Sequence, residues 1–286
     1  MTPRERFNER RDAALEAMGE RRDSAFERVA DARDAATERM ADARDAATER
    51  MADARDAAAE RVADAKAAAA EQIAKVKPRL RGVTHEYAFF VSLVLGAVLI
   101  VLAKGFEARV AIAVYAVSLS ALFGVSALYH RVQWERPAVR RWMRRLDHTM
   151  IFLLIAGTVT PFAVLVLHGT LANALLIAVW AGAAAGIVVE LVWVDAPKWV
   201  TALVYVGVGW IGALGFPGIV GNAGPGAGAL IAVGGILYTA GAVIYARQRP
   251  DPNPAVFGYH EIFHVLVIAA AVTHFAAVAF FALPAA

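Results

Sequence analysis

The sequence predicts an all-α protein in which a long amphipathic helix precedes a seven-transmembrane helix bundle. The chain of 286 residues is 59% hydrophobic, and its apolar runs of roughly 18 or more residues are long enough to cross a bilayer. The first part is instead rich in Ala, Arg, Asp and Glu. We therefore expect two domains, residues 1–82 and 83–286. The absence of Cys excludes disulfides, thiol catalysis and thiolate ligands, so any metal must be held by His or carboxylates.

An eleven-residue repeat organises residues 1–82, with a glutamate at the first position of successive units from Glu5 to Glu71. Eleven residues make about three helical turns, so equivalent positions return to nearly the same helix face. An unbroken helix as far as Lys77 would be roughly 110 Å long. Pro78 is expected to end it.

One repeat unit shows how this helix distributes its charges. On a helical wheel, Val29, Ala32 and Ala36 cluster on one side, Arg28 and Arg33 flank them, and acidic residues lie opposite. This layout is expected of a helix lying on membrane lipid. Because the apolar side is mostly Ala, a solvated helix or a weak right-handed coiled coil that self-associates is the alternative. A nucleic-acid partner is not expected.

Seven apolar spans follow the repeat, at about residues 87–103, 110–130, 147–167, 171–193, 199–216, 228–245 and 259–283. The Gly-rich stretch between Phe216 and Gly228 is expected to be a loop.

Basic residues in the short loops predict the orientation of the spans, because cytoplasmic loops are enriched in Lys and Arg. Only Lys104 and Arg109 fall on one side of the alternating topology. The other side carries Lys75, Lys77, Arg79, Arg81, Arg131, Arg136, Arg140, Arg141, Arg144, Arg145, Lys198, Arg247 and Arg249. We therefore expect a multi-pass protein of the plasma (inner) membrane with a cytoplasmic N-terminus and an external C-terminus.

A candidate metal site emerges from this topology. His260 and His264 are four residues apart, so both imidazoles lie on one helix face. The topology brings His130 and Asp147 to the same depth, near the cytoplasmic face. Three neutral imidazoles suit Zn²⁺ and leave a fourth position for water. Asp147 would then hold that water or accept its proton, and Ser126, one turn before His130, would donate a hydrogen bond in the same pocket.

Each of these residues also has a simpler interpretation. A histidine at a membrane interface is often only an interfacial polar group. Asp147 could cap the third span, and Ser126 could bond a backbone carbonyl.

Several motifs resemble the haemolysin III family, the bacterial branch of the progestin and adipoQ receptor superfamily. The resemblance covers residues 83–286 and rests on Ser126-x-x-x-His130, Arg145-Leu146-Asp147-His148, Thr160-Pro161-Phe162, and His260-Glu261-Ile262-Phe263-His264 followed by His274-Phe275. It implies that His130, His260 and His264 bind zinc, that Asp147 contacts the zinc-bound water, and that Ser126 is the family's serine. It also implies distant kinship with alkaline ceramidases, which hydrolyse lipid amides.

Three functions are consistent with these residues. The first is a zinc-dependent hydrolase that uses zinc-activated water, with Asp147 as base, on a lipid, fatty-acyl amide or sphingolipid-like substrate. The second is a receptor-like, membrane-regulatory or haemolytic protein in which zinc staples the helices. The third is an intramembrane zinc protease, because His260-Glu261-x-x-His264 matches H-E-x-x-H.

Four further polar residues receive no role from the sequence: Glu261, Glu190, His148 and His274. His274 lies roughly 21 Å along the helix from His260, which excludes it from the same ion. His148 points about 100° away from its neighbour Asp147.

Overall fold

The computed structural model describes residues 78–285 continuously, residues 42–62, and single residues or short runs between 15 and 40. The chain divides into two compact units, Met1–Gln72 and Ile73–Ala286. The described residues form helices and no β-strand. The predicted all-α fold class is therefore confirmed.

In the first unit, residues 42–62 form one continuous helix. The hydroxyl of Thr48 donates to the carbonyl oxygen of Arg44 (2.8 Å), the helical bond that threonine makes to the preceding turn. Met40, Met51 and Val62, which occupy the position of Val29 in the three following repeat units, are exposed. Much of the predicted unbroken helix lies outside the described residues.

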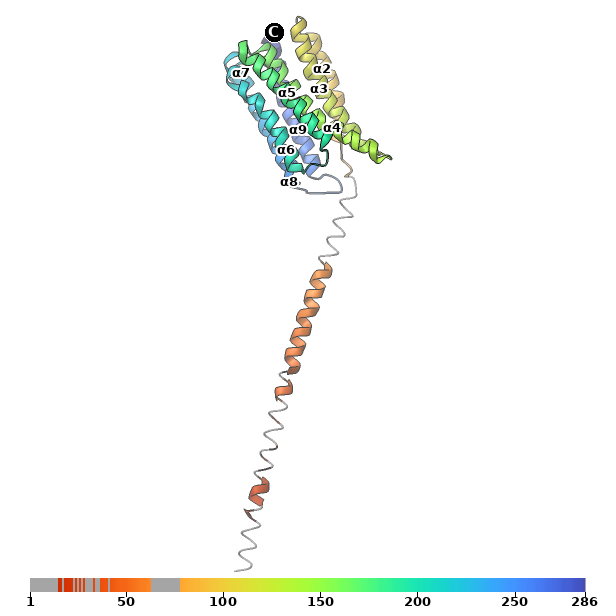
Figure 1. Cartoon of the computed structure of the whole chain (residues 1–286), viewed down its shortest axis with the longest axis vertical. Helices are drawn as coiled ribbons and strands as arrows, with labels where there is room; N and C mark the ends of the chain where they lie inside the picture. Colours follow the sequence, from red (N-terminus) through yellow and green to blue (C-terminus); the bar gives the residue numbers. More distant parts are fainter. Residues whose placement is uncertain are drawn as a thin grey trace, which may run out of the picture. The chain divides into compact units, whose positions relative to one another are not determined.

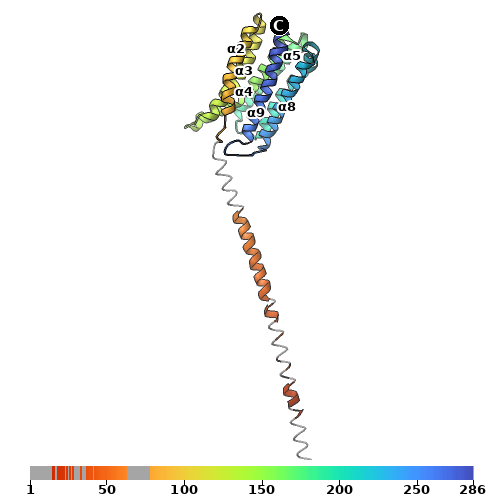
Figure 2. The same cartoon turned by 180° about the vertical axis from the view of Figure 1, so that it is seen from behind.

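The second unit contains seven helical segments long and apolar enough to cross a membrane (Figures 1 and 2), as predicted. The segments are α2 (Val83–Leu102), α3 (Phe106–Arg131), α4 (Pro137–Leu165), α5 (Gly169–Val192), α6 (Lys198–Ile211) continued by η1 (Gly212–Gly215) and α7 (Phe216–Ala223), α8 (Pro225–Arg247), and α9 (Tyr259–Ala277) continued by η2 (Val278–Ala282) and η3 (Leu283–Ala285).

The expected loop between Phe216 and Gly228 is wrong. Phe216–Ala223 is helical, and α8 already begins at Pro225, so only Gly224 separates the two helices. Backbone groups at membrane depth must be hydrogen-bonded within the protein. Proline is compatible with the first turn of a helix, and glycine is common in transmembrane helices. The Gly-rich composition was therefore a poor loop signal here.

Neighbouring helices pack mainly in sequence order. α3 packs on α2 and α4, α4 on α5, and α9 on α8 (Figures 1 and 2). Ile112 and Tyr115 of α3 and Phe152 of α4 are almost fully buried. Gly186 of α5 lies against the Phe152 ring so closely that a Cβ there would overlap it. A glycine at this position lets α4 and α5 approach each other.

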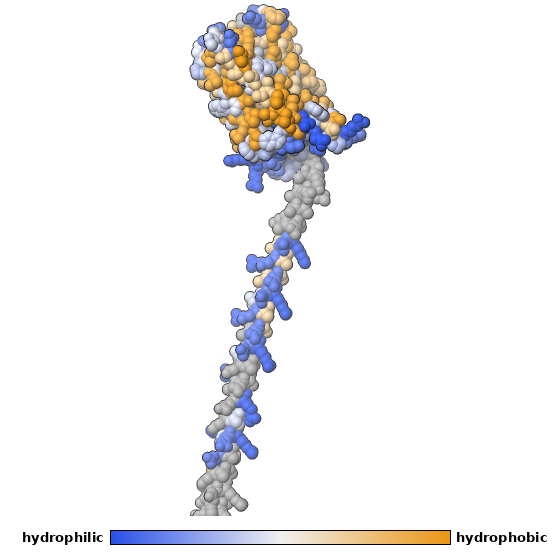
Figure 3. Space-filling model, viewed as in Figure 1, coloured by the Kyte–Doolittle hydropathy of each residue, from blue (hydrophilic) through white to orange (hydrophobic). Residues whose placement is uncertain are grey.

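One end of the bundle carries most of the charge. The visible side surface is largely hydrophobic, whereas hydrophilic residues gather at the end where α2 begins and α3 ends (Figure 3). Ion pairs link elements at this end, among them Arg131 Nε with Glu86 Oε2 (2.8 Å) and Arg144 with Asp195 (3.0 Å). An apolar flank with a charged end is what a membrane-embedded bundle requires.

The predicted orientation can be measured directly because the chain lacks Cys. Glu107 and Glu135 are exposed near opposite ends of α3. With a membrane-impermeant maleimide, we expect the Glu107→Cys variant to be labelled in intact spheroplasts. The Glu135→Cys variant should be labelled only after permeabilisation. The opposite pattern would reverse the orientation, and equal labelling of both in intact spheroplasts would contradict the spanning arrangement.

Candidate metal centre

Three imidazoles converge at the charged end of the bundle. His130 lies in the last turn of α3, and His260 and His264 lie on consecutive turns of α9. One ligand nitrogen from each ring can be chosen so that all three lie within 4.8 Å of one another. His130 and His264 are buried, at 7% and 2% exposure. These side chains are therefore enclosed by the bundle rather than displayed at a membrane interface.

The spacing of these nitrogens fits a metal ion. Nitrogens about 2.0–2.1 Å from a tetrahedral zinc ion are about 3.3 Å apart. His130 Nε2 and His260 Nε2 are separated by 3.2 Å. The His260 and His264 rings are inclined at 63° with centroids 4.5 Å apart. The two ring planes therefore cross, and one ion could lie in both of them. The three residues could hold a metal ion.

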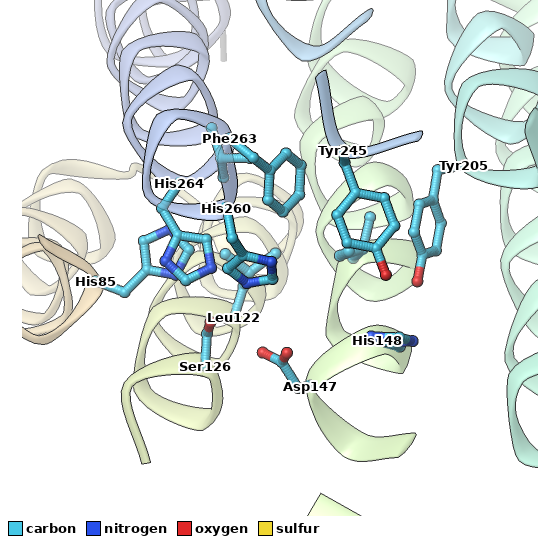
Figure 4. Close-up of a pocket in the computed structure, with 12 residues that line it drawn as sticks. His85, Leu122, Ser126, Asp147, His148, Tyr205, Tyr245, His260, Phe263 and His264 are labelled. Atoms are coloured by element: carbon cyan, nitrogen blue, oxygen red, sulfur yellow. The ribbon is translucent and has the colours of Figure 1, made fainter. Parts of the chain in front are cut away.

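Asp147 adds a carboxylate to this group. Its Oδ2 lies 3.5 Å from His130 Nε2, and its carboxylate points toward Ser126 in Figure 4. Ser126 is 3% exposed, one turn before His130. The alternative in which Asp147 caps its helix is wrong, because α4 begins at Pro137 and Asp147 lies well inside it. The structure therefore brings together all five residues singled out in the sequence.

A pocket opens beside the imidazoles (Figure 4). Residues of α2, α3, α4, α6, α8 and α9 line it: His85, Leu122, Ser126, Asp147, His148, Ile151, Tyr205, Tyr245, His260, Phe263, His264 and Val267. Its volume of about 30 Å³ leaves space for a water molecule. Because the pocket borders His260, His264 and Asp147 together, a molecule in it would meet the open side of a bound ion.

His85 is a pocket residue that the sequence reasoning missed. It is 2% exposed, and its ring stacks on His264 with centroids 3.8 Å apart and planes 13° from parallel. An ion bound to a ring nitrogen lies in the plane of that ring, so an ion on His264 lies far from the plane of His85. His85 therefore supports the His264 ring rather than joining the ligand set. The first span was expected to start at residue 87, which left His85 in a loop.

Glu261 has a structural role at the start of α9. One carboxylate oxygen, Oε1, accepts a hydrogen bond from Arg81 Nε. The other, Oε2, accepts one from the backbone N–H of Gly258 (2.8 Å), which caps the first turn of α9. Glu261 does not line the pocket. Both carboxylate oxygens of Glu261 are thus hydrogen-bonded, and the side chain lies outside the pocket that borders His260 and His264.

The segment that precedes α2 packs directly on the site. The N–H groups of Arg79 and Leu80 donate to the carbonyl oxygens of Ala255 and Val256 (3.1 and 3.2 Å). Gly82 has a φ of 80°, and a Cβ on it would lie only 2.6 Å from His130 Cβ. Glycine is needed here both for its backbone conformation and for the close approach to a ligand.

The remaining polar residues separate into two groups. His274 Nε2 lies 3.3 Å from the carbonyl oxygen of Ile231 and is absent from the metal-ligating group. It is thus a polar group bonded within the bundle through Nε2, and it lies apart from the cluster, as its distance along the helix predicts. His148 instead lines the pocket, and its Nδ1 lies 3.0 Å from Glu190 Oε2.

The fold and site define a class of protein: a seven-span membrane protein with a largely buried histidine cluster that could hold a metal ion near one end of the bundle. Comparison with known proteins gives the family. Residues 73–275 match the model of the haemolysin-III related family, and the chain belongs to this family. The resemblance inferred from the sequence motifs is confirmed.

Named relatives extend from bacteria to mammals. The chain is 32% identical to Hemolysin-3 of Bacillus cereus over 207 residues, covering 71% of this chain and 91% of the relative. It is 28% identical to the Hemolysin-3 homolog of Bacillus subtilis (strain 168) over 202 residues, covering 70% and 91%. It is 26% identical to the human monocyte to macrophage differentiation factor over 198 residues, covering 68% and 80%.

The close packing of Gly82 on His130 can be tested by metal content. Gly82→Ala should displace His130 and lower the metal content of the purified protein, measured by mass spectrometry. Gly105→Ala is the matched control, because Gly105 also has a φ of 80° but has no neighbouring atom within 4 Å of a Cβ. Both variants should lose about 1–3 kcal/mol of stability, because both glycines have a positive φ that other residues adopt at a cost. Equal metal content in the two variants would contradict this role for Gly82.

Proposed function

We propose that the protein is a membrane zinc hydrolase that cleaves a lipid or fatty-acyl amide with water. The observation that carries the proposal is the convergence of three imidazoles, two buried and one partly buried, with a carboxylate on the side of a pocket. Structural zinc sites usually have four protein ligands, whereas catalytic sites keep a position open. When bound, zinc would make a coordinated water nucleophilic at neutral pH.

The roles of the protein groups follow from where they lie. His130, His260 and His264 would hold the ion. Asp147, 3.5 Å from His130, would orient the attacking water and accept its proton. The Ser126 hydroxyl, buried on the same helix face as His130, would donate a hydrogen bond to the oxygen of the acyl group as negative charge develops there.

The location of the pocket supports a lipid-derived substrate. It lies among membrane-spanning helices near one end of the bundle, a depth that an acyl chain reaches from the bilayer. Kinship with lipid amidohydrolases, inferred from the motifs, points to an amide of a fatty acid or a sphingolipid-like molecule. The basic residues at this end support a cytoplasmic location for the site in the plasma membrane.

A second function has its own support. α3 packs mainly on α2 and α4, and α9 packs mainly on α8. An ion held by His130 and the two histidines of α9 would therefore join helices that otherwise rest on other neighbours. In this alternative the metal staples the bundle, and the protein acts as a membrane regulator or a haemolytic factor, as the names of the Bacillus relatives suggest.

The protease alternative is weaker because it needs Glu261 as general base. The contacts of Glu261 with Arg81 and Gly258 occupy both of its oxygens. Asp147, not Glu261, lines the pocket.

Asp147→Asn separates the hydrolase from the staple. We expect the variant to retain its zinc, because the three imidazoles remain, and to lose about 10²–10⁴-fold in hydrolysis, because the proton acceptor is gone. The probe is a dodecanoyl amide of a fluorogenic amine, presented to the full-length protein in detergent.

Asp195→Asn is the matched control, since Asp195 is an exposed carboxylate at the same end of the bundle (76% exposed) and should leave the rate unchanged. Zinc retention with an undiminished rate in Asp147→Asn would contradict the role of Asp147. A wild-type protein that binds zinc but cleaves no acyl amide would favour the staple.

A further inference from the structure

A second buried polar cluster lies beside the candidate metal centre and has no role in the scheme above. His148 of α4, Glu190 of α5 and Tyr205 of α6 form it. Glu190 Oε2 lies 3.0 Å from His148 Nδ1, and Glu190 Oε1 accepts a hydrogen bond from the Tyr205 hydroxyl (3.2 Å). Glu190 is 3% exposed. A carboxylate buried among membrane helices is costly and usually functional.

Helix packing explains why these residues meet. α4 and α5 follow each other through a short connection and pack together, and the Phe152 ring lies directly against Gly186. His148 lies one turn before Phe152, and Glu190 lies one turn after Gly186. The glycine contact therefore brings the two side chains together on the next turn.

The hydrogen bond between Glu190 and Nδ1 of His148 leaves the other ring nitrogen, Nε2, available to the pocket. An ionised carboxylate only accepts hydrogen bonds, so with Glu190 as the acceptor the shared proton would be carried by Nδ1 of His148. Among the described residues, His148 Nε2 has no recorded hydrogen-bond partner. His148 lines the pocket, and the hydroxyls of Tyr205 and Tyr245 point toward the side of the pocket where His148 lies (Figure 4). The cluster thus presents an imidazole, held by a buried carboxylate, to the same pocket as Asp147.

We propose that His148 is the proton donor to the leaving group and that Glu190 is its positioning residue. This inference rests on the proposed hydrolase function and deepens it. Hydrolysis of an amide needs both a base for the water and an acid for the departing amine. A carboxylate on Nδ1 holds the ring in place and stabilises the imidazolium, as in other His–carboxylate pairs.

The proton balance closes with these two residues. The water oxygen forms a bond to the acyl carbon, and its proton passes to Asp147. The C–N bond breaks with its electron pair on nitrogen, and the Nε2 proton of the His148 imidazolium passes to that nitrogen, which leaves the ring neutral with its remaining proton on Nδ1. The products are a fatty acid and an amine. The proton on Asp147 then returns through a pocket water to His148, which restores the starting state.

A purely structural role for the cluster makes a different prediction. If His148 only tied α4 to α5, its loss would slow every reaction of the site equally. A proton donor matters for an amide, whose amine is a poor leaving group, and matters little for an ester of p-nitrophenol, which leaves without protonation. The dependence on the leaving group therefore separates the two roles.

The test compares His148→Asn with the wild type on two probes that carry the same dodecanoyl group: an amide of a fluorogenic alkylamine and the p-nitrophenyl ester. The Asn side chain keeps a donor near Nδ1 for Glu190 and removes the pocket-facing nitrogen. His168→Asn, at an exposed histidine, is the matched control. Glu190→Gln tests the positioning residue, and zinc content is measured in each variant.

We expect His148→Asn to keep its zinc, to lose about 10²-fold or more on the amide, and to change by less than about threefold on the ester. Glu190→Gln should show the same selectivity with a smaller loss, and His168→Asn should match the wild type. Equal losses on both probes, or no loss on the amide, would overturn the inference while leaving the hydrolase intact. A wild type that cleaves neither probe would instead overturn the proposed function, and the inference with it.

Discussion

Lipid offers no hydrogen-bond partner, so a polar side chain buried in this bundle is stabilised only where the protein, or a ligand held within it, supplies one. The convergence of His130, His260 and His264 is the strongest case of this constraint. Three imidazoles from two helices face one another at a spacing that suits a metal ion. Much of the surrounding structure supports these rings: His85 stacks on His264, Gly82 fits against His130, and Glu261 caps the helix that carries the other two.

The same constraint divides the acidic residues by task. Glu261 is hydrogen-bonded to Arg81 and to the first turn of α9, and Glu190 is hydrogen-bonded to His148 and Tyr205. Asp147 differs because it faces the pocket beside His130. A pocket beside three imidazoles that could hold a metal ion, with one carboxylate and one carboxylate-held imidazole facing it, has the groups that the proposed hydrolysis needs: an electrophile site, a base and an acid.

Much of this arrangement could be predicted from the sequence. The i, i+4 spacing placed His260 and His264 on one face, and the alternation of spans brought His130 and Asp147 to their depth. Local signals failed where composition misleads or where partners are distant. Gly and Pro suggested a loop at Phe216–Gly228, although membrane helices tolerate both. The pairing of Arg81 with Glu261, or of His148 with Glu190, depends on how helices pack, and no periodicity within a helix reports that.

Zinc content of the purified full-length protein is the most direct test of the central claim. The matched variants are His264→Ala and His274→Ala, which remove two histidines of α9, one inside the cluster and one bonded to Ile231. We expect about one zinc per chain in the wild type and in His274→Ala, by analogy with other three-histidine sites, and loss of zinc in His264→Ala. Full zinc stoichiometry in His264→Ala would contradict a metal site built on His130, His260 and His264.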